Sequence, residues 1–495
     1  MTTSVELQHY VSGTWFQGDG GIITSVNPAR PDETVAHGLQ AGPADVERAV
    51  ASADAAKHGW ARTPAHERGA VLPRSAVILE QYSQVWGLEL AREEGKTLAE
   101  GQGEVLRAAQ IFRYYGNNGD READAVYSSP RRREKIFVIR KALGVVGVVT
   151  PFNFPIAIPA WKIAPALTYG NAVVWKPAST VPLLAMRLTQ ALEEAGLPDG
   201  VLNLLIGPGS IGTALVEHPA VDGLSFTGST GVGRTLAAAA ARHGVPIQAE
   251  MGGKNAAIVL ADADLELATE QVILGAFRSS GQKCTATSRL IVADTVADDF
   301  LAGLAAKAQF LIVGDPADPS TEMGPLVSGP ARTSILRGMD AALNQGAGLL
   351  AGGFPYEDTA RAAGYFVAPT ILELREATHA DVWRDELFGP VLSVRRAAST
   401  TVAFDLANDS EFGLSAALFT QDVTLALEGM DELDVGILHV NSESAGADPH
   451  VPFGGAKKSG YGPKEQGQSA KEFYTHTTTV YLQGGRRSSL RGAGA

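Results

Sequence analysis

The sequence predicts an α/β protein built around an open, mostly parallel sheet. Short apolar segments alternate with helical segments between residues 145 and 252, and a Gly-rich turn follows one of them. The same alternation returns in a second region over residues 253–450. Strands and helices that alternate at this spacing form parallel sheets with helices on both faces. The length of 495 residues also exceeds one ordinary domain.

The first part of the chain is expected to be helical after some short turn-rich pieces. Pro43 begins an amphipathic helix, which places Val46, Ala49, Val50, Ala53 and Trp60 on one face. A second helix is predicted over about Glu67–Gly95 and a third over Leu98–Tyr115. Most of these residues are expected only to pack against a sheet.

Two β-prone segments stand apart from this pattern. Pro130 and a basic run over residues 131–133 precede the extended stretch Ile136–Arg140, which predicts an exposed ribbon or a solvated edge strand. The stretch Phe473–Leu482 is rich in Thr, Tyr and Val and also favours a strand. Residues 485–495 are mostly Gly, Arg, Ser and Ala, so we expect a loose tail.

The alternating region predicts strands at Val145–Val149, Ala172–Trp175, Val201–Ile206 and Leu224–Phe226, and helices at Pro159–Tyr169, Leu183–Ala195 and Ile211–Glu217. Open sheets of this kind bind ligands beyond the carboxyl ends of their strands. Residues 176–179 and the run 228–233 follow two of these strands. Small residues that open a helix suit a phosphate, although this run is not the G-x-G-x-x-G fingerprint and could be a plain turn.

Composition excludes several classes of protein. The net charge of −13 argues against binding to nucleic acid or to anionic membranes. The apolar runs are too short to span a membrane, and residues 1–10 do not have the pattern of a secretion signal. A single cysteine fits a reducing cytoplasm, and no convincing cluster of metal ligands is present.

That single cysteine, Cys284, is either filler, a surface thiol or a nucleophile. A helix over Leu265–Ser280, ended by Gly281, precedes it, and a strand over Arg289–Val292 follows. The thiol therefore lies in a tight polar connection, where backbone N–H groups are free to face a reacting atom. A buried filler cysteine usually lies in an apolar run, so the nucleophile is favoured.

Two further residues complete a chemical set. Glu250 is followed by the glycine pair at 252–253, which allows the carboxylate to swing, and Asn153 lies between aromatic residues and prolines after the strand Val145–Val149. A thiol, a carboxylate and an amide are the nucleophile, general base and oxyanion donor of acyl chemistry.

On these residues the chain resembles the NAD(P)-dependent aldehyde dehydrogenase superfamily. The matching motifs, in family order, are residues 151–155, 175–179, 226–230, 250–254, 281–284, 386–390 and 452–455. The resemblance implies the aldehyde dehydrogenase fold: an open Rossmann-like NAD(P)-binding domain over 1–122 and 143–252, and an α/β catalytic domain over 253–450. It also implies a β-ribbon oligomerisation arm over 123–142 and 470–484, a flexible tail over 485–495, and a homodimer or homotetramer.

The resemblance also implies a role for each site residue. The Cys284 thiolate attacks the aldehyde, Asn153 and the Cys284 N–H hold the oxyanion, and water activated by Glu250 hydrolyses the thioester. Lys162 relays a proton, with His476 as its partner by alignment, or Glu472 after a shift of a few residues. The residues implied in cofactor binding are Thr150, Pro151, Phe152, Lys176, Ser179, Gly228, Ser229, Gly233, Gly252, Glu386 and Phe388.

The identity of the cofactor depends on Ser179, which stands where NAD-selective members often carry Glu. A hydroxyl does not repel a 2′-phosphate, so the expected cofactor is NAD or NADP, with NADP accepted; no metal is expected. A coenzyme-A-acylating enzyme would not need Glu250. A Cys hydrolase would need a histidine base in a recognisable motif, and a non-catalytic scaffold would have no reason to keep the three residues together.

The substrate is the least determined feature. Lys283 and Arg107 are two cations expected at the mouth of an apolar tunnel lined by Phe154, Trp161, Phe453 and Thr285. Such a tunnel suits an aldehyde with a distal carboxylate. Residues 281–289 and 450–467 most resemble the α-ketoglutaric semialdehyde (2,5-dioxopentanoate) dehydrogenases. The alternatives are that both cations face solvent or pair with acidic neighbours, and that the substrate is an uncharged aromatic or aliphatic aldehyde, or succinate semialdehyde.

Overall fold

The computed structural model of the chain describes residues 4–118, 124–375 and 379–485. Its larger sheet has eight strands in the order β22-β12-β11-β8-β9-β10-β2-β3. The five central strands, β12 to β10 in that order, are parallel to one another, whereas β22 and β2 join the two ends antiparallel. The bounds are β2 His9–Val11, β3 Thr14–Phe16, β8 Val145–Val149, β9 Ala172–Lys176, β10 Leu202–Leu204, β11 Gly223–Gly228, β12 Ile247–Met251 and β22 Gly460–Tyr461.

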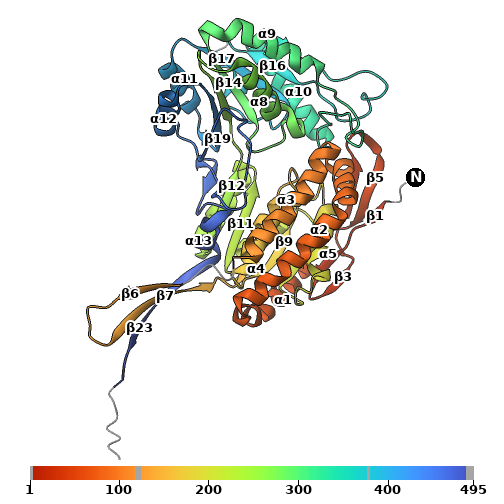
Figure 1. Ribbon diagram of the computed structural model, residues 1–495. Helices are drawn as coiled ribbons and strands as arrows, with labels where there is room; N and C mark the ends of the chain where they lie inside the picture. Colours follow the sequence, from red (N-terminus) through yellow and green to blue (C-terminus); the bar gives the residue numbers. More distant parts are fainter. Residues whose placement is uncertain (1–3, 119–123, 376–378, 486–495) are drawn as a thin grey trace, which may run out of the picture.

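Helices cover both faces of this sheet, as the alternation predicts (Figure 1). Successive valines of β8 alternate between two cores: Val146 and Val148 pack with helices α2 to α5, and Val145 and Val149 pack with α1, α6 and α7. This is the two-residue period of a strand buried on both faces. The helices are α1 Pro43–Arg62, α2 Ala65–Glu94, α3 Leu98–Gly116, α4 Ala157–Thr168, α5 Leu183–Glu194, α6 Ser210–Glu217 and α7 Thr230–His243.

A second sheet of seven strands forms the other half of the body, in the order β15-β16-β17-β14-β13-β19-β20, with all pairs parallel except β15–β16. Its strands are β13 Asn255–Val259, β14 Thr287–Ala293, β15 Gly348–Ala351, β16 Thr370–Glu373, β17 Val391–Ala397, β19 Ser415–Phe419 and β20 Ile437–Val440. Its helices are α8 Leu265–Phe277, α9 Asp294–Phe310, α10 Gly329–Asn344, α11 Thr400–Asn408 and α12 Val423–Glu432. The chain crosses from the first sheet to the second between β12 and β13.

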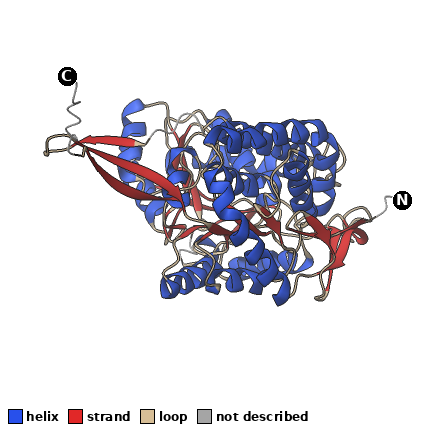
Figure 2. Cartoon of the chain, turned by 90° about the horizontal axis from the view of Figure 1, so that it is seen from below, coloured by secondary structure: helices blue, strands red, loops and turns tan. Residues whose placement is uncertain are grey.

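Three strands form an arm that projects from the body (Figures 1 and 2). They are β6 Ala125–Ser128, β7 Glu134–Ala142 and β23 Thr475–Gln483, with β7 in the middle. The register of β7 with β23 runs from Ala142 opposite Thr475 to Glu134 opposite Gln483. The exposed ribbon expected near residue 136 therefore pairs with the C-terminal strand. The tail at 486–495 lies outside the described residues.

The smaller elements connect these parts. A small sheet near the N-terminus contains β1 Val5–Glu6, β4 Ile22–Asn27 and β5 Arg30–Leu39, and a short ladder joins β18 Phe412–Gly413 to β21 Ala456–Lys457. The turns η1 Arg278–Gly281, η2 Asp381–Trp383 and η3 Gly467–Ser469, and helix α13 Ala470–Tyr474, complete the fold. No helix in the described part of the chain is long and apolar enough to cross a membrane.

One predicted boundary is wrong in an informative way. The helix expected over Leu265–Ser280 ends at Phe277, and η1 follows it. Ser279 and Ser280 have φ values of 51° and 54°, in the left-handed region. Tertiary partners hold this conformation, because the Ser279 N–H donates to Glu100 and the Ser280 hydroxyl donates to the carbonyl of Gly324. The spacing of apolar residues in the sequence does not reveal contacts with such distant residues.

Candidate active site

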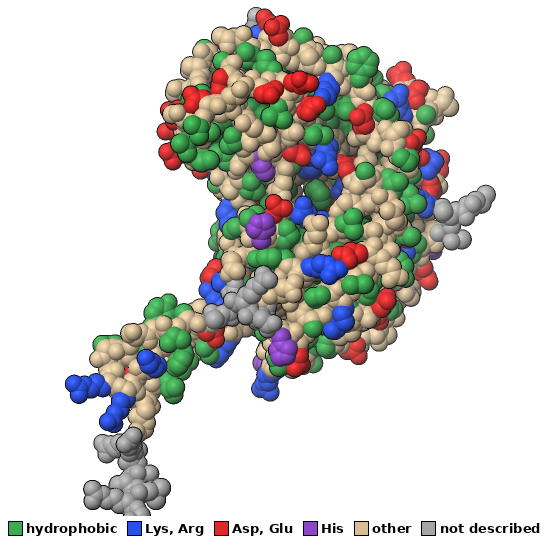
Figure 3. Space-filling model, viewed as in Figure 1, with side chains coloured by type: hydrophobic (Ala, Val, Ile, Leu, Met, Phe, Trp, Pro, Cys, Tyr) green, Lys and Arg blue, Asp and Glu red, His purple; other side chains and the backbone are tan. Residues whose placement is uncertain are grey.

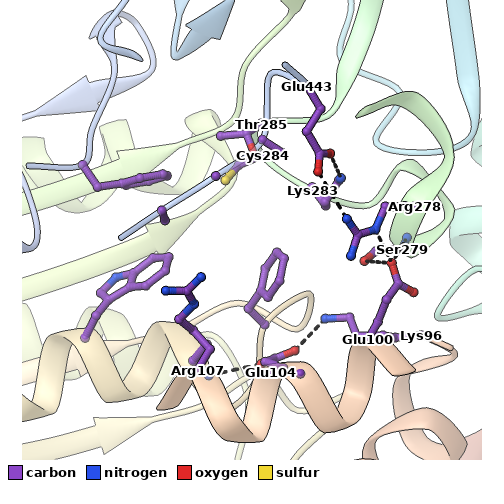
Figure 4. A pocket seen from close by; sticks show the side chains of 18 of the residues that line it. Lys96, Glu100, Glu104, Arg107, Arg278, Ser279, Lys283, Cys284, Thr285 and Glu443 are labelled. Carbon is purple, nitrogen blue, oxygen red and sulfur yellow. Dashed lines mark hydrogen bonds and ion pairs between the residues drawn. The ribbon is translucent and has the colours of Figure 1, made fainter. Parts of the chain in front are cut away.

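The loop that carries Cys284 lies beside a cavity of about 330 Å³ between the two halves of the body. Figure 3 shows the surface hollowed in this region, with basic side chains around the hollow. One wall comes from the start of α3 and the loop that leads into α4. The opposite wall comes from the Cys284 loop and the loop after β20 (Figure 4). The lining includes Lys96, Glu100, Glu104, Arg107, Phe154, Trp161, Arg278, Ser279, Lys283, Cys284, Thr285, Glu443 and Phe453.

Cys284 is half-buried, and the side chain of Asn255 holds its backbone in place. The side chain of Asn255 donates to the carbonyls of Cys284 and Ala286 at 2.8 and 2.9 Å, which ties the loop to the start of β13. Burial raises the pKa of the thiol to about 12, and the carboxylates of Glu386, Glu250 and Glu465 act in the same direction. The resting group is therefore a protonated thiol that needs a base.

Glu250 is the fourth residue of β12 and is buried. Its Oε2 accepts a hydrogen bond of 3.0 Å from the Gly455 N–H. Burial raises the pKa of this carboxyl well above its usual range, and the nearby carboxylate of Glu465 raises it further. A carboxylate with a raised pKa is a stronger base than a solvent-exposed one, which suits it to take a proton from a thiol or a water.

Asn153 is also buried, in the loop between β8 and α4. Its backbone carbonyl accepts from Lys96 Nζ at 2.7 Å, and its side-chain Oδ1 has no hydrogen-bond partner in the described residues. That oxygen is free to accept a hydrogen bond from a ligand, whereas an oxyanion would be held by the N–H groups of the same amide.

The prediction that His476 or Glu472 is the partner of Lys162 was wrong. Lys162 Nζ contacts Glu465, and both side chains are buried. The Ser225 hydroxyl also accepts from Lys162 at 2.9 Å. His476 lies exposed on the arm, and Glu472 pairs with Arg140 at 2.6 Å, so neither reaches Lys162. Glu465 lies within a stretch that carries the family resemblance. Its pairing with Phe453 in an isolated β-bridge depends on the tertiary fold, so the sequence alone does not predict it.

The residues predicted to bind a cofactor lie along the carboxyl ends of β8, β9 and β11 and around the crossing to the second sheet. Ser229 is the N-cap residue of α7, and a Cβ at Gly233 would lie 2.6 Å from the Met251 sulfur, so a larger residue there would have to displace that side chain. Thr150 Oγ1 accepts from Trp175, while Thr227 and Thr230 have buried hydroxyls without a partner among the described residues. Unused donors beside a helix N-terminus fit an anionic ligand.

Lys176, at the end of β9, makes no ion pair within the described residues. Burial lowers its pKa to about 8. The Ser179 hydroxyl donates to the Gly207 carbonyl at 3.1 Å. A buried lysine with no carboxylate partner is free to bind a hydroxyl or a phosphate.

Glu386 and Phe388 approach from the second half of the chain. Glu386 Oε1 accepts from the Gly253 N–H at 3.0 Å, and a Cβ at Gly252 would lie only 1.9 Å from Glu386 Oε2. The rings of Phe388 and Phe152 meet edge to face with centroids 5.8 Å apart. The two predicted groups of cofactor residues, distant in sequence, therefore lie against each other, with Pro151 in the same loop as Phe152.

Both cations predicted at the tunnel line the cavity, and both are paired with carboxylates. Lys283 Nζ lies 3.3 Å from Glu443, with the lysine side chain 7% exposed. Arg107 lies 3.3 Å from Asp448, and this pair is exposed, at 39% and 61%. Pairing with acidic neighbours, which was the alternative expectation, is what the structure shows. Arg278 also contacts Glu443, at 3.2 Å.

Sequence reasoning missed the acidic partners of these cations and the Lys96–Glu104 pair. No spacing connects residues 100, 278 and 443, which meet only through the fold. Among the described residues, no group of three or more His, Cys, Asp or Glu side chains could hold a metal ion.

Comparison with known proteins agrees with this arrangement. The model of the aldehyde dehydrogenase family matches residues 15–480. The chain belongs to the aldehyde dehydrogenase family. Its oxidoreductase chemistry follows from that membership, and the two-sheet body with a projecting arm is the fold of this family, as predicted.

Two curated relatives of this aldehyde dehydrogenase share almost its full length. The α-ketoglutaric semialdehyde dehydrogenase of Bacillus subtilis is 42% identical over 96% of this chain and 98% of the relative. The α-ketoglutarate semialdehyde dehydrogenase of Haloferax volcanii is 40% identical over 96% and 98%. A crystal structure of betaine aldehyde dehydrogenase from Staphylococcus aureus, in complex with NAD+, superposes with a TM-score of 0.93 at 31% identity, covering 96% of this chain and 94% of that one.

Proposed function

We propose that this aldehyde dehydrogenase oxidises an ω-oxo acid, such as α-ketoglutaric semialdehyde, to a dicarboxylic acid with reduction of NAD(P)+. The observation that carries the proposal is the cation-lined cavity beside Cys284, with Lys283, Arg278 and Arg107 along it. A distal carboxylate could bind one of these cations while the aldehyde carbon reaches the thiol. The names of the two similar proteins above support the same substrate class.

In this proposal each residue of the site has a separate role in the reaction. Cys284 loses its proton to a base, and its sulfur forms a bond to the aldehyde carbon. The Asn153 amide and the Cys284 N–H hold the oxygen that becomes negative, and such donors contribute about 10²–10³ in rate each. When bound, NAD(P)+ accepts the hydride from that carbon, which leaves a thioester on Cys284. Glu250 then takes a proton from water, whose oxygen displaces the sulfur and releases the acid.

The buried Lys162–Glu465 pair supports a proton relay from Glu250. Glu465 raises the pKa of Glu250, so the two carboxylates influence one another electrostatically. Trp161 Nε1 donates to Glu465 at 2.6 Å and fixes its orientation. We assign Lys162 and Glu465 to this relay in place of the histidine expected from alignment.

For the cofactor, Lys176 and Ser179 would face the adenosine ribose, Ser229 and the glycines at 228 and 233 the pyrophosphate, and Glu386 and Phe388 the nicotinamide end. With a free lysine and no carboxylate at 179, acceptance of NADP is proposed beside NAD. We also propose that the chain divides into an NAD(P)-binding domain over 1–122 and 143–252 and a catalytic domain over 253–450. In this proposal the arm joins the chains of a homo-oligomer, and the enzyme is located in the cytoplasm.

An uncharged aldehyde is the second candidate, because the Lys283–Glu443 and Arg107–Asp448 pairs already neutralise both cations. The test compares kcat/KM for an ω-oxo acid with that for an uncharged aldehyde of equal length. We expect the wild type to prefer the acid, and Lys283→Met or Arg107→Met to reduce that preference about tenfold or more, since charge-assisted hydrogen bonds contribute about 1.5–3 kcal/mol each. If the acid has no advantage, or keeps it in both variants, the enzyme is a general aldehyde dehydrogenase.

A further inference from the structure

The start of α3, together with Lys96 just before it, contacts the Asn153 loop in its own wall of the cavity and the Cys284 loop in the opposite wall. Three charged side chains within nine residues, Lys96, Glu100 and Glu104, point into the space between the Asn153 loop and the Cys284 loop (Figure 4). The reaction steps above use none of them. Their hydrogen bonds go mainly to the two loops that carry reacting groups.

The first contact is with the Asn153 loop. Lys96 Nζ donates to the backbone carbonyl of Asn153 at 2.7 Å and to Glu104 at 2.6 Å. Glu104 accepts in turn from the N–H groups of Ile156 and Ala157, at 3.0 and 3.1 Å. The ammonium of Lys96 also lies 4.0 Å from the centre of the Phe154 ring. This ion pair therefore holds the loop at Asn153 itself and at the residues that follow it, up to the start of α4.

The pair is fully enclosed, with the Lys96 and Glu104 side chains 1% and 2% exposed. Burial alone would lower the pKa of Lys96, but the carboxylates of Glu104 and Glu94 outweigh it and raise that pKa, so the lysine is charged. A buried ion pair adds little net stability compared with well-packed apolar residues. Its hydrogen bonds to the loop backbone, however, fix a geometry that apolar side chains would leave free.

The second contact is with the nucleophile loop. Glu100 accepts from the N–H and the hydroxyl of Ser279 at 2.8 and 3.1 Å, while its other oxygen accepts from Thr97 at the start of α3. Ser279 has a left-handed backbone with φ of 51°, which is held in place only by surrounding contacts. Glu100 and Glu104 are four residues apart, so they lie on one face of the helix.

We propose that the start of α3 is a rigid spacer that sets the distance between the oxyanion donor Asn153 and the Cys284 thiol. Lys96 and Glu104 are positioning residues for Asn153, and Glu100 is the positioning residue for the nucleophile loop. The inference rests on the proposed role of Asn153. A helix is suited to this task because its length is fixed by its own hydrogen bonds, whereas the two loops belong to different sheets.

A double-mutant cycle on the holoenzyme tests the Asn153 half. The variants are Asn153→Ala, the charge-free pair Lys96→Met with Glu104→Leu, and the triple variant, and the readout is the rate of the pre-steady-state NAD(P)H burst. We expect Asn153→Ala to slow the burst by about 10²–10³-fold. The pair should slow it about 10- to 100-fold, because a small misplacement of a reacting group costs up to about 10²-fold. The triple variant should be no slower than Asn153→Ala.

Two further measurements distinguish a loss of positioning from a general disruption of the structure. Alkylation of Cys284 by iodoacetamide forms no oxyanion, so the pair variant should keep the wild-type alkylation rate. As a matched control, Arg113→Gln with Glu80→Gln removes an exposed ion pair between α3 and α2, 43% and 40% exposed, and should leave the burst unchanged. Losses that add in the triple variant, or a normal burst in the pair variant, would overturn the spacer. A normal burst in Asn153→Ala would instead refute the proposed role of Asn153.

Glu100 gives an independent test if the buried pair variant does not fold. Glu100→Ala removes the acceptor for Ser279 and should slow both the burst and the alkylation of Cys284, by about tenfold or more. Glu100→Gln keeps an oxygen acceptor and should restore most of both rates. If Glu100→Ala reacts like the wild type, Glu100 does not position the nucleophile.

Discussion

At the scale of single residues, environment separates the tasks of Cys284 and Glu250. Burial and three carboxylates keep the thiol protonated at rest, with a pKa of about 12, whereas burial and the Glu465 carboxylate raise the pKa of Glu250 well above its usual range. Glu250 is therefore a stronger base for a water than an exposed carboxylate, and the Cys284 thiol reacts slowly until it loses its proton.

This assignment predicts different defects for the two residues. Cys284→Ala should abolish dehydrogenation and any esterase activity, because both need the sulfur. Glu250→Gln should keep a burst of about one NAD(P)H per site and lose about 10²–10⁴-fold in steady-state turnover, the usual contribution of a general base. Stopped-flow absorbance of NAD(P)H measures both phases. Loss of the burst in Glu250→Gln would mean that this carboxylate acts before hydride transfer.

At the scale of elements, the sequence was sufficient where the signal is local. Strand β8 was predicted with its exact bounds, and the Cys284, Glu250 and Asn153 segments could be singled out because unusual residues stand next to strand ends. It was insufficient where a partner is distant. The Lys162 partner was sought near 476 and lies at 465, and η1 interrupts a regular apolar pattern because Glu100 and Gly324 hold its serines.

The same distinction applies to the charges of the cavity. Lys283 and Arg107 could be placed near the nucleophile from their motifs, but the carboxylates that pair with them come from the loop after β20. Lys283 and Glu443 are 160 positions apart and meet because β14 and β20 belong to one sheet, whereas Arg107 and Asp448 meet across the two halves of the body. The composition and periodicity of the sequence therefore do not predict these ion pairs.

The end of β9 permits a prediction about the cofactor. Ser179→Glu adds a carboxylate that should repel a 2′-phosphate, so kcat/KM for NADP should fall about tenfold or more while that for NAD is retained or improved. Ser179→Ala is the matched control, since it removes the hydroxyl without adding charge and should affect both cofactors alike. Steady-state kinetics with each cofactor decides the matter, and equal losses in Ser179→Glu would show that this position does not contact the phosphate.

At the scale of the whole molecule, the arm is not explained by a single chain. Its outer strands, β6 and β23, each have one edge that pairs with no described strand. Val126, Tyr127, Tyr481 and Leu482 are 63%, 55%, 58% and 59% exposed. Open edges and exposed apolar side chains favour pairing with another chain, and folded proteins usually cover them.

We therefore predict a dimer, or a tetramer assembled from dimers, in which the arm is covered by another copy of the chain. Tyr481→Lys with Val126→Lys should lower the oligomeric state, because each adds a charge where an apolar contact is expected. Ile22→Lys, at a side chain 79% exposed on the body, is the control and should leave the assembly unchanged. Light scattering coupled to size-exclusion chromatography gives the mass of each variant. A wild-type chain that runs as a stable monomer would remove the arm from any role in assembly, while a wild-type oligomer that survives both arm substitutions would place the contact elsewhere on the molecule.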